Sequence, residues 1–248
     1  MTSNFNYSVR VKNGAGWRKH NRIRLMISVG KEYHEGKKLA AVVNWINRNP
    51  SIQEVHISVN DLLQRHNLEA AGMSKEQAER VAIAEGTLWI ERNEKILNEI
   101  KAKKFYTRWQ DWVEQSDFRA THQQLISYAK ADPAFGAVMA KDAQSLAERK
   151  AKRGEIVPAL LIAHSRDYIE EEMTIFAMQT AALPAAEVYP GSNLLGAEYL
   201  LQQNARASDG LPSAIRHLAQ RYFTRIDFDR INVAPAYASG AATRPHAA

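Results

Sequence analysis

Residues 22–59 read RIRLMISVGKEYHEGKKLAAVVNWINRNPSIQEVHISV, and this stretch decides the fold class. Its first segment, 22–28, alternates its side chains between two faces, as a β-strand does. The segment 36–47 carries apolar residues at helical spacing and stops before Pro50, and 54–59 alternates again. A strand, a helix and a second strand in this order predict a βαβ unit, and therefore an α/β fold with a parallel sheet.

The composition of the chain limits its class. The 248 residues, 45% apolar and 24% charged, suffice for one α/β domain with a well-filled core. No apolar run is long enough to span a membrane, and the N-terminus lacks the apolar segment of a secretory signal. The absence of cysteine excludes disulfides, thiolate catalysis and Cys-ligated zinc, and it fits a reducing cytosol, so we expect a cytoplasmic protein. The net charge of +6 suggests an anionic partner such as nucleic acid.

Beyond the βαβ unit, the patterns predict more helices than strands. The sequence SKEQ at 74–77 is a capping box, which opens a helix to about Ala102. Further helices are predicted at about 105–130, 133–152, 155–183, 193–205 and 212–222, with a short strand at 185–189. Along the chain we expect a polar lead-in at 1–21, a single domain at 22–235 and a flexible tail at 236–248.

Ser28 is the first candidate for chemistry. It ends the first predicted strand, at the edge where open parallel sheets bind their ligands. Position alone leaves two interpretations open, a serine that caps a turn or a nucleophile at the mouth of a pocket. The chain contains no G-x-S-x-G elbow, P-loop or G-x-G-x-x-G motif. No metal site is predicted, because the eight histidines are scattered and lack H-x₃-H spacing.

A second candidate lies in DYIEEEMTIFAMQTAALP, residues 167–184. Tyr168, Glu172 and Phe176 follow each other at intervals that place them on one helix face. Runs of glutamates are usually solvated, but a face shared with aromatic residues would be partly buried. A carboxylate in that position can bind an amine or transfer a proton. Further on, Tyr189 ends a predicted strand and Pro190 breaks it.

Basic residues gather between positions 75 and 108, with aromatic side chains among them. Glutamates offset most of these charges, so an exposed, salt-bridged helix and a phosphate-binding face both remain open. The residues predicted to bind nucleic acid are Arg80, Arg92, Lys95, Lys101, Lys103 and Lys104.

Taken together, Ser28 at a strand end, Tyr168 and Glu172 in a Y-x-x-x-E pattern, and the Tyr189-Pro190 pair resemble the motifs of the tRNA-dependent cyclodipeptide synthases. The Tyr-Pro pair is similar to the subgroup with Tyr-Pro in place of Tyr-His. The resemblance implies a Rossmann-like catalytic domain similar to class I tyrosyl- and tryptophanyl-tRNA synthetases, without ATP, cofactor or metal. It also implies aminoacyl-tRNA substrates, and we expect a monomer.

The resemblance further implies a ping-pong reaction. Ser28 attacks the ester of one aminoacyl-tRNA and holds the aminoacyl group, which the amine of a second aminoacyl-tRNA then attacks. The resulting dipeptidyl-enzyme closes to a cyclic dipeptide. Glu172 would hold the substrate ammonium, Tyr168 would orient it, and Tyr189 would serve positioning and proton transfer.

The strand faces predict a polar aminoacyl pocket. Arg24 and Met26 share a face with Ser28, and His56, Ser58 and Asn60 share the corresponding face of the next strand. Either these faces line the pocket, which would then favour a polar, charged or small substrate residue, or they meet solvent or a covering helix. The predicted pocket residues are Arg24, Met26, His56, Ser58 and Pro190.

Two other functions compete with this interpretation. A catalytically silent RNA-binding module on a synthetase-like fold would use the basic residues and would not need Ser28. A serine hydrolase would need a base and an oxyanion hole beside Ser28, and no Ser-His-acid set can be located in the sequence.

Overall fold

The structure, a computed structural model, describes the chain except for residues 1–4, 13–15, 153–157, 204, 206–208 and 233–248. The predicted tail at 236–248 therefore lies outside the described residues. Within the described part, no helix is long and apolar enough to cross a membrane.

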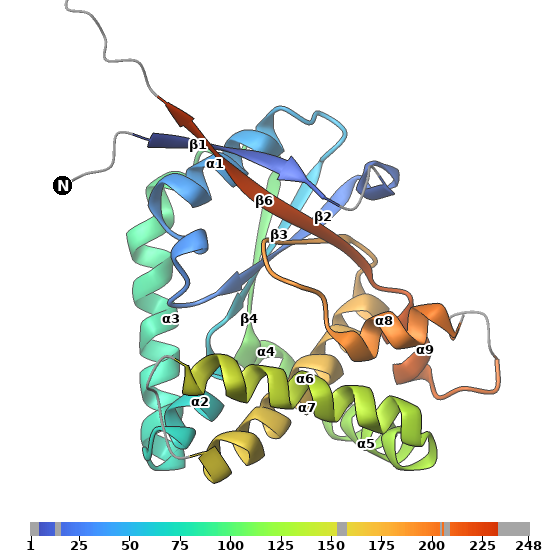
Figure 1. Cartoon of the computed structure of the whole chain (residues 1–248). Coiled ribbons are helices and arrows are strands. Elements are labelled where there is room, and N and C mark those ends of the chain that lie inside the picture. Colours follow the sequence, from blue (N-terminus) through green and yellow to red (C-terminus); the bar gives the residue numbers. More distant parts are fainter. Residues whose placement is uncertain (1–4, 13–15, 153–157, 204, 206–208, 233–248) are drawn as a thin grey trace, which may run out of the picture.

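A six-stranded sheet forms the centre of the molecule, in the order β1-β6-β5-β2-β3-β4 (Figure 1). Only β1 is antiparallel to its neighbour, while the other strands run parallel. The strands are β1 Phe5–Val11, β2 Arg22–Ser28, β3 Glu54–Asn60, β4 Lys103–Arg108, β5 Ala186–Tyr189 and β6 Tyr222–Asn232. The chain proceeds outward from β2 to β4 and then returns to β5 on the other side of β2. This reversal makes the carboxyl ends of β2 and β5 a topological switch point, where such sheets bind ligands.

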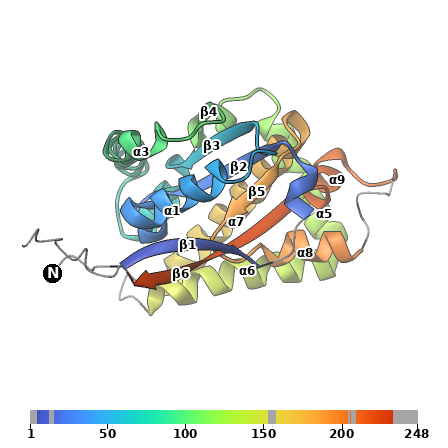
Figure 2. The same ribbon diagram turned by 90° about the horizontal axis from the view of Figure 1, so that it is seen from above.

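Helices cover both faces of the sheet, with α1 and α3 on one side and α6, α7 and α8 on the other (Figure 2). The helices are α1 Gly36–Asn47, α2 Arg65–Ala70, α3 Lys75–Leu97, α4 Trp109–Val113, α5 Phe118–Ala131, α6 Pro133–Ala151, α7 Pro158–Ala182, α8 Leu195–Gln202 and α9 Ser213–Ala219. Short 3₁₀ turns lie at Gly16–Lys19, Glu32–His34 and Leu62–Gln64.

The alternation in β2 divides the core into two layers. Ile23, Leu25 and Ile27 are fully buried against the α1 and α3 side. Met26 points to the opposite face and joins the cluster that contains Met173 of α7. Both faces of β2 are therefore buried, as expected for a parallel strand covered on both sides.

The sequence predictions for the first half of the sheet are confirmed. Strands at 22–28 and 54–60 and a helix at 36–47 occupy the expected positions. The predicted cap of α3 is also present, because Ser74 Oγ accepts a hydrogen bond from the Gln77 amide at 3.3 Å. The helix favoured over 155–183 is α7 in the part that the structure describes, and the strand at 185–189 is β5.

Three predictions about elements were wrong or incomplete. The helix expected to reach Ala102 ends at Leu97, and the helix expected from 105 begins instead as strand β4. Parallel pairing of KKFYTR with β3 outweighs its weak local helical pattern. Part of the polar lead-in forms β1, which pairs with β6, a strand that the sequence reading missed. Pairing of these two segments from opposite ends of the chain extends the sheet beyond β5.

Candidate active site

Ser28 lies at the carboxyl end of β2, beside the end of β5, and is 6% exposed. Its Oγ is 3.1 Å from the hydroxyl oxygen of Tyr189, which is in turn 2.9 Å from the hydroxyl oxygen of Tyr33. The three side chains thus form a continuous chain of hydroxyl groups at the switch point of the sheet. Such a chain can pass a proton to or from Ser28 without a charged base.

The backbone after Ser28 folds back onto the strand. Gly30 has a φ of +80°, a conformation that favours glycine, and it turns the chain into the 3₁₀ segment at Glu32–His34. The Ser28 amide donates a hydrogen bond to His34 Nδ1 at 2.9 Å. Burial lowers the pKa of His34 to about 3, so its imidazole is neutral at physiological pH. His34 therefore fixes the backbone of Ser28 and does not serve as a base for its hydroxyl.

A close glycine contact holds the ring of Tyr189. A Cβ atom on Gly191 would lie 2.3 Å from Cε1 of Tyr189, so only glycine allows this approach of the loop to the ring. Burial raises the pKa of Tyr189 far above its usual value. The phenol consequently stays protonated and can both accept and donate a hydrogen bond.

A cavity of about 370 Å³ opens beside Ser28. Tyr168 and Glu172, one helical turn apart on α7, line it together with Ser28 and Tyr189. The structure thus brings together four residues that the sequence analysis selected from three distant segments. Apolar walls come from Met26 and other residues of the sheet and of α6 and α7.

The carboxyl group of Glu172 stands in the cavity wall without a hydrogen-bond partner in the described part of the chain. Burial raises its pKa to about 8, and the positive charge of Arg221 only partly opposes this effect. Burial, and then the charge of Glu172, also raise the pKa of Tyr168 well above its usual value. The site therefore presents a neutral carboxyl group and neutral phenols near pH 7.

The model of the cyclodipeptide synthase family matches residues 14–187. The chain belongs to the cyclodipeptide synthase family. It is accordingly an aminoacyl-transferring enzyme, which favours the enzymatic interpretation over a silent RNA-binding module. No curated protein matches the chain.

Solved cyclodipeptide synthases share the fold at low sequence identity. The enzyme from Fluoribacter dumoffii is 19% identical, with a TM-score of 0.76 over 92% of this chain and 100% of that chain. A Mycobacterium tuberculosis protein, described as evidence that these synthetases are related to type I tRNA synthetases, is 20% identical with a TM-score of 0.64, covering 92% and 96%. The enzyme from Candidatus Glomeribacter gigasporarum, solved with Phe-tRNA, is 18% identical with a TM-score of 0.63, covering 88% and 92%.

Arg24 lies outside the cavity of this cyclodipeptide synthase, contrary to the sequence prediction. Its guanidinium bonds to Glu187 Oε1 at 3.0 Å and to the carbonyl oxygens of Gln179 and Leu183 at 2.7 and 2.9 Å. The end of α7 covers this part of the strand face. Arg24 thus joins β2 and β5 to α7 beneath the site, and of the predicted pocket residues Met26 lines the cavity.

The other predicted pocket residues also lie elsewhere. Ser58 is fully buried and accepts a hydrogen bond from Gln179 Nε2 at 3.0 Å. His56 stacks on Phe105 at 4.6 Å, near the opposite end of β3. Pro190 lines a separate hollow next to β1 and β6. The end of α7 covers the positions of Arg24 and Ser58, so on this face of β2 and β3 the cavity reaches Met26, Ser28 and Asn60.

The predicted tRNA-binding cations are spread over a helix, a loop and a strand. They occupy helix α3, the edge strand β4 and the loop between these two elements, and none of them lines the cavity. Arg92 forms an exposed ion pair with Glu35 at 3.4 Å. Helix α3 carries Arg80, Arg92 and Lys95, the loop after it carries Lys101, and β4 carries Lys103 and Lys104.

Sequence reasoning missed Tyr33, His34 and Arg221. Tyr33 and His34 follow the turn at Gly30. A glycine two residues after the predicted strand was therefore an available signal that the chain turns back toward Ser28. Arg221 bonds to Glu187 in the cavity floor from a position far along the chain. No local pattern pointed to that contact.

Proposed function

We propose that this enzyme forms a cyclic dipeptide from two aminoacyl-tRNAs, with Ser28 carrying the aminoacyl and then the dipeptidyl group as esters. The observation that carries the proposal is the contact of 3.1 Å between Ser28 Oγ and the Tyr189 hydroxyl at the mouth of the cavity that Glu172 lines. The Tyr189-Pro190 pair further suggests the Tyr-Pro subgroup of the family.

In the first transfer, Ser28 Oγ attacks the ester carbonyl and the bond to the ribose oxygen of the tRNA breaks. The Ser28 proton ends on the departing ribose hydroxyl, with Tyr189 able to accept one proton and donate another. An aminoacyl ester is already activated, so covalent capture requires no ATP. A neutral phenol suits this step, because an ester exchange neither creates nor consumes net charge.

Glu172 is suited to hold the amino group of the bound aminoacyl ester. Its pKa of about 8 matches that of an α-amino group, about 7.7–8.0, so a proton moves between them at little cost. When the amine enters as an ammonium ion, the carboxyl ionises and pairs with it. When an amine must attack, the same carboxylate can take the proton.

In the second transfer, the amine of another aminoacyl-tRNA attacks the aminoacyl-Ser28 ester and restores the serine hydroxyl. The dipeptidyl group, now esterified to the second tRNA, passes to Ser28 Oγ as its bond to the ribose oxygen breaks, and the serine proton ends on the departing ribose hydroxyl. The amine of the dipeptide then attacks the carbonyl of the Ser28 ester. Ring closure releases the cyclic dipeptide and regenerates the Ser28 hydroxyl. An enclosed cavity favours this intramolecular attack by holding the reacting atoms close together.

The exposed cations of α3 and β4 would bind tRNA phosphates. Such contacts orient the substrate without reading its sequence. The relative from Candidatus Glomeribacter gigasporarum, described as bound to Phe-tRNA, supports tRNA as the partner of this fold.

The test compares the wild type with Ser28→Ala on a mixture of all aminoacyl-tRNAs, with cyclic dipeptides detected by mass spectrometry. We expect product from the wild type and none from the variant. Ser127→Ala, on helix α5 away from the cavity, is the matched control and should retain activity. Undiminished product from Ser28→Ala would refute the role of Ser28.

A further inference from the structure

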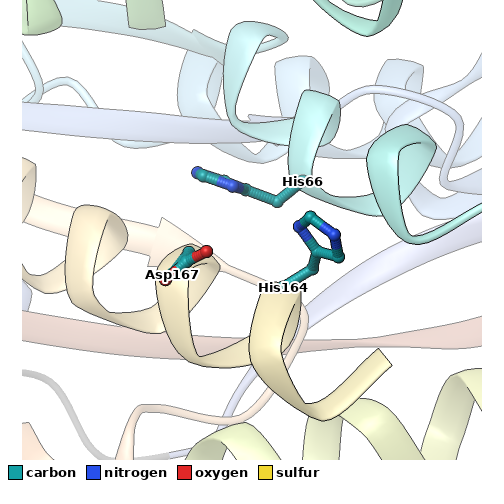
Figure 3. Close-up of side chains that lie close together, drawn as sticks. All are labelled: His66, His164 and Asp167. Atoms are coloured by element: carbon teal, nitrogen blue, oxygen red, sulfur yellow. The ribbon is translucent and has the colours of Figure 1, made fainter. Parts of the chain in front are cut away.

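His66, His164 and Asp167 gather between two helices that lie far apart in the sequence (Figure 3). His66 comes from α2, while His164 and Asp167 are three residues apart on α7 and so share a face. One ligand atom from each residue lies within 4.8 Å of the other two. H-x₃-H spacing joins two histidines on a single helix, so it does not detect a group whose members come from α2 and α7.

Both imidazoles carry a nitrogen that the described chain leaves unsatisfied. His66 is 8% exposed, and the Nδ1 atoms of His66 and His164 are buried with no hydrogen-bond partner in the described structure. Buried polar atoms are nearly always bonded, so two such atoms in one cluster require an explanation. A bound cation satisfies imidazole lone pairs in this situation.

A carboxylate lies beside each histidine, and at His66 it faces the nitrogen opposite the unsatisfied one, as in many metal sites. His66 Nε2 lies 3.3 Å from Glu171 Oε2, which leaves Nδ1 of that ring as the free lone pair. At His164, by contrast, Glu69 Oε2 lies 3.6 Å from Nδ1, the same nitrogen that lacks a hydrogen bond, so this carboxylate does not orient the ring from its other nitrogen. Metal-binding histidines are usually oriented by such a neighbouring carboxylate.

The charges around the cluster permit a cation. Arg65, the nearest buried cation in sequence, is already paired with Glu171. Asp167 is exposed and forms no ion pair among the described residues, so its carboxylate is available. Tetrahedral zinc with bonds of about 2.0–2.1 Å needs ligand atoms about 3.4 Å apart. Side-chain rotations that move each ligand atom by about 1 Å would bring the three atoms to that spacing.

We propose that His66, His164 and Asp167 form a site for a zinc-type divalent cation that ties α2 to α7. Two imidazole nitrogens and one carboxylate oxygen are donors that suit zinc, and three protein ligands leave a further position for water. Asp167 directly precedes Tyr168, and the rings of His66 and Tyr168 lie edge to face at 6.4 Å. The ion would therefore fix the helix that presents Tyr168 to the cavity. This proposal does not depend on the proposed reaction.

The test uses the full chain, with any affinity tag removed, stripped of metal by chelator and titrated with ZnCl₂ in a calorimeter. We expect one zinc ion bound per chain and, at a 100-fold excess over Kd, a rise in Tm of about 5 °C. His164→Gln and Asp167→Asn should each weaken binding by at least about 10-fold. Co²⁺, titrated in parallel, should give visible absorption bands that both variants lose.

His122→Gln is the matched control, because His122 also lies near α7, 3.8 Å from Glu170, but outside the cluster. It should bind zinc as the wild type does. Circular dichroism of the metal-free variants separates a binding defect from a folding defect. No zinc binding by the wild type, or equal binding by the wild type and both cluster variants, would overturn the proposal.

Discussion

Glu171 and Glu172 are neighbours on α7, yet their surroundings give them opposite protonation states. Glu171 receives hydrogen bonds from both nitrogens of the Arg65 fork, one of them at 2.8 Å, and from Trp109 Nε1 at 2.8 Å. Burial alone would raise its pKa, but the bonds from His66 and Arg65 outweigh burial and hold the pKa at about 2. Glu172 receives no such bond from the residues that the structure describes, and burial raises its pKa to about 8.

The difference follows from helix geometry and from what each face meets. Successive residues of a helix point about 100° apart, so Glu171 faces α2 and α4 while Glu172 faces the cavity. A carboxylate whose acceptor sites are all occupied stabilises the fold and has no capacity left for a substrate. A carboxyl group that lacks partners is costly to the fold but is available for an incoming amine. The pair therefore separates a structural role from a chemical one within a single run of glutamates.

The largest expected effect is a loss of turnover in Glu172→Gln. The same loss in Glu171→Gln would contradict the contrast between the two glutamates. Glu172→Gln should lower cyclic dipeptide formation by about 10³-fold, because the amide can neither pair with an ammonium ion nor accept a proton. Rates of product formation from aminoacyl-tRNA, followed by mass spectrometry, measure this effect. Glu171→Gln, compared among molecules that remain folded, should keep most of the wild-type rate. Equal losses in the two variants would contradict the assignment of roles.

The free energy of unfolding should respond in the opposite way, with a large loss in Glu171→Gln and not in Glu172→Gln. Glu171→Gln removes the close counter-ion of the buried Arg65 guanidinium and leaves only the half-exposed Glu79 at 3.9 Å among the described residues, which should cost about 3–5 kcal/mol. Urea denaturation followed by circular dichroism measures the loss. Glu172→Gln is the matched control and should lose no stability at pH 7, because its amide has no proton to release on unfolding. A stability loss below about 1 kcal/mol in Glu171→Gln would show that its bonds are not structural.

The pH dependence of the free energy of unfolding tests whether Glu172 is protonated in the folded protein. Because the folded state raises the pKa of Glu172 from 4.5 to about 8, folding retains a proton that the unfolded chain loses between these values. The contribution of Glu172 to stability is therefore complete below pH 4.5 and is lost as the pH rises to about 8. Relative to Glu172→Gln, the wild type should lose about 4 kcal/mol between pH 5 and pH 9. A constant difference across this range would mean that Glu172 is ionised in the folded state.

The smallest effect is expected on the outer surface, away from both glutamates. Replacing Arg92 and Lys95 together by alanine should weaken tRNA binding several-fold, and the loss should shrink as salt rises, because phosphate contacts are screened. Filter binding at several salt concentrations measures it. Unchanged affinity would identify α3 as a solvated face and redirect attention to other cations.

The sequence supplied much of the site. The spacing of Tyr168 and Glu172 predicted their common face, and the strand pattern predicted that Ser28 ends β2 at the ligand-binding edge. Both inferences depend on local periodicity, which the fold preserves. The contrast between Glu171 and Glu172 could not be predicted, because it depends on Arg65 and Trp109 from distant segments.

The failures have the same physical origin. Arg24 shares a strand face with Ser28 as predicted, but the end of α7 covers it, so on this face of β2 the cavity begins at Met26. The strand β4 and the pair of β1 and β6 arise from pairing with distant partners, and no short pattern in KKFYTR outweighed the helical surroundings. Local periodicity is visible in a sequence, whereas the identity of the covering element is not.

The covalent intermediate provides the most direct test of the central claim that Ser28 carries the acyl group. The enzyme is mixed with a single type of aminoacyl-tRNA that it accepts, quenched in acid, digested and mapped by mass spectrometry. The account predicts one aminoacyl residue attached to the peptide that contains Ser28, and its absence in Ser28→Ala. An aminoacyl group on any other residue, or product formation by an enzyme that never acquires the adduct, would contradict it.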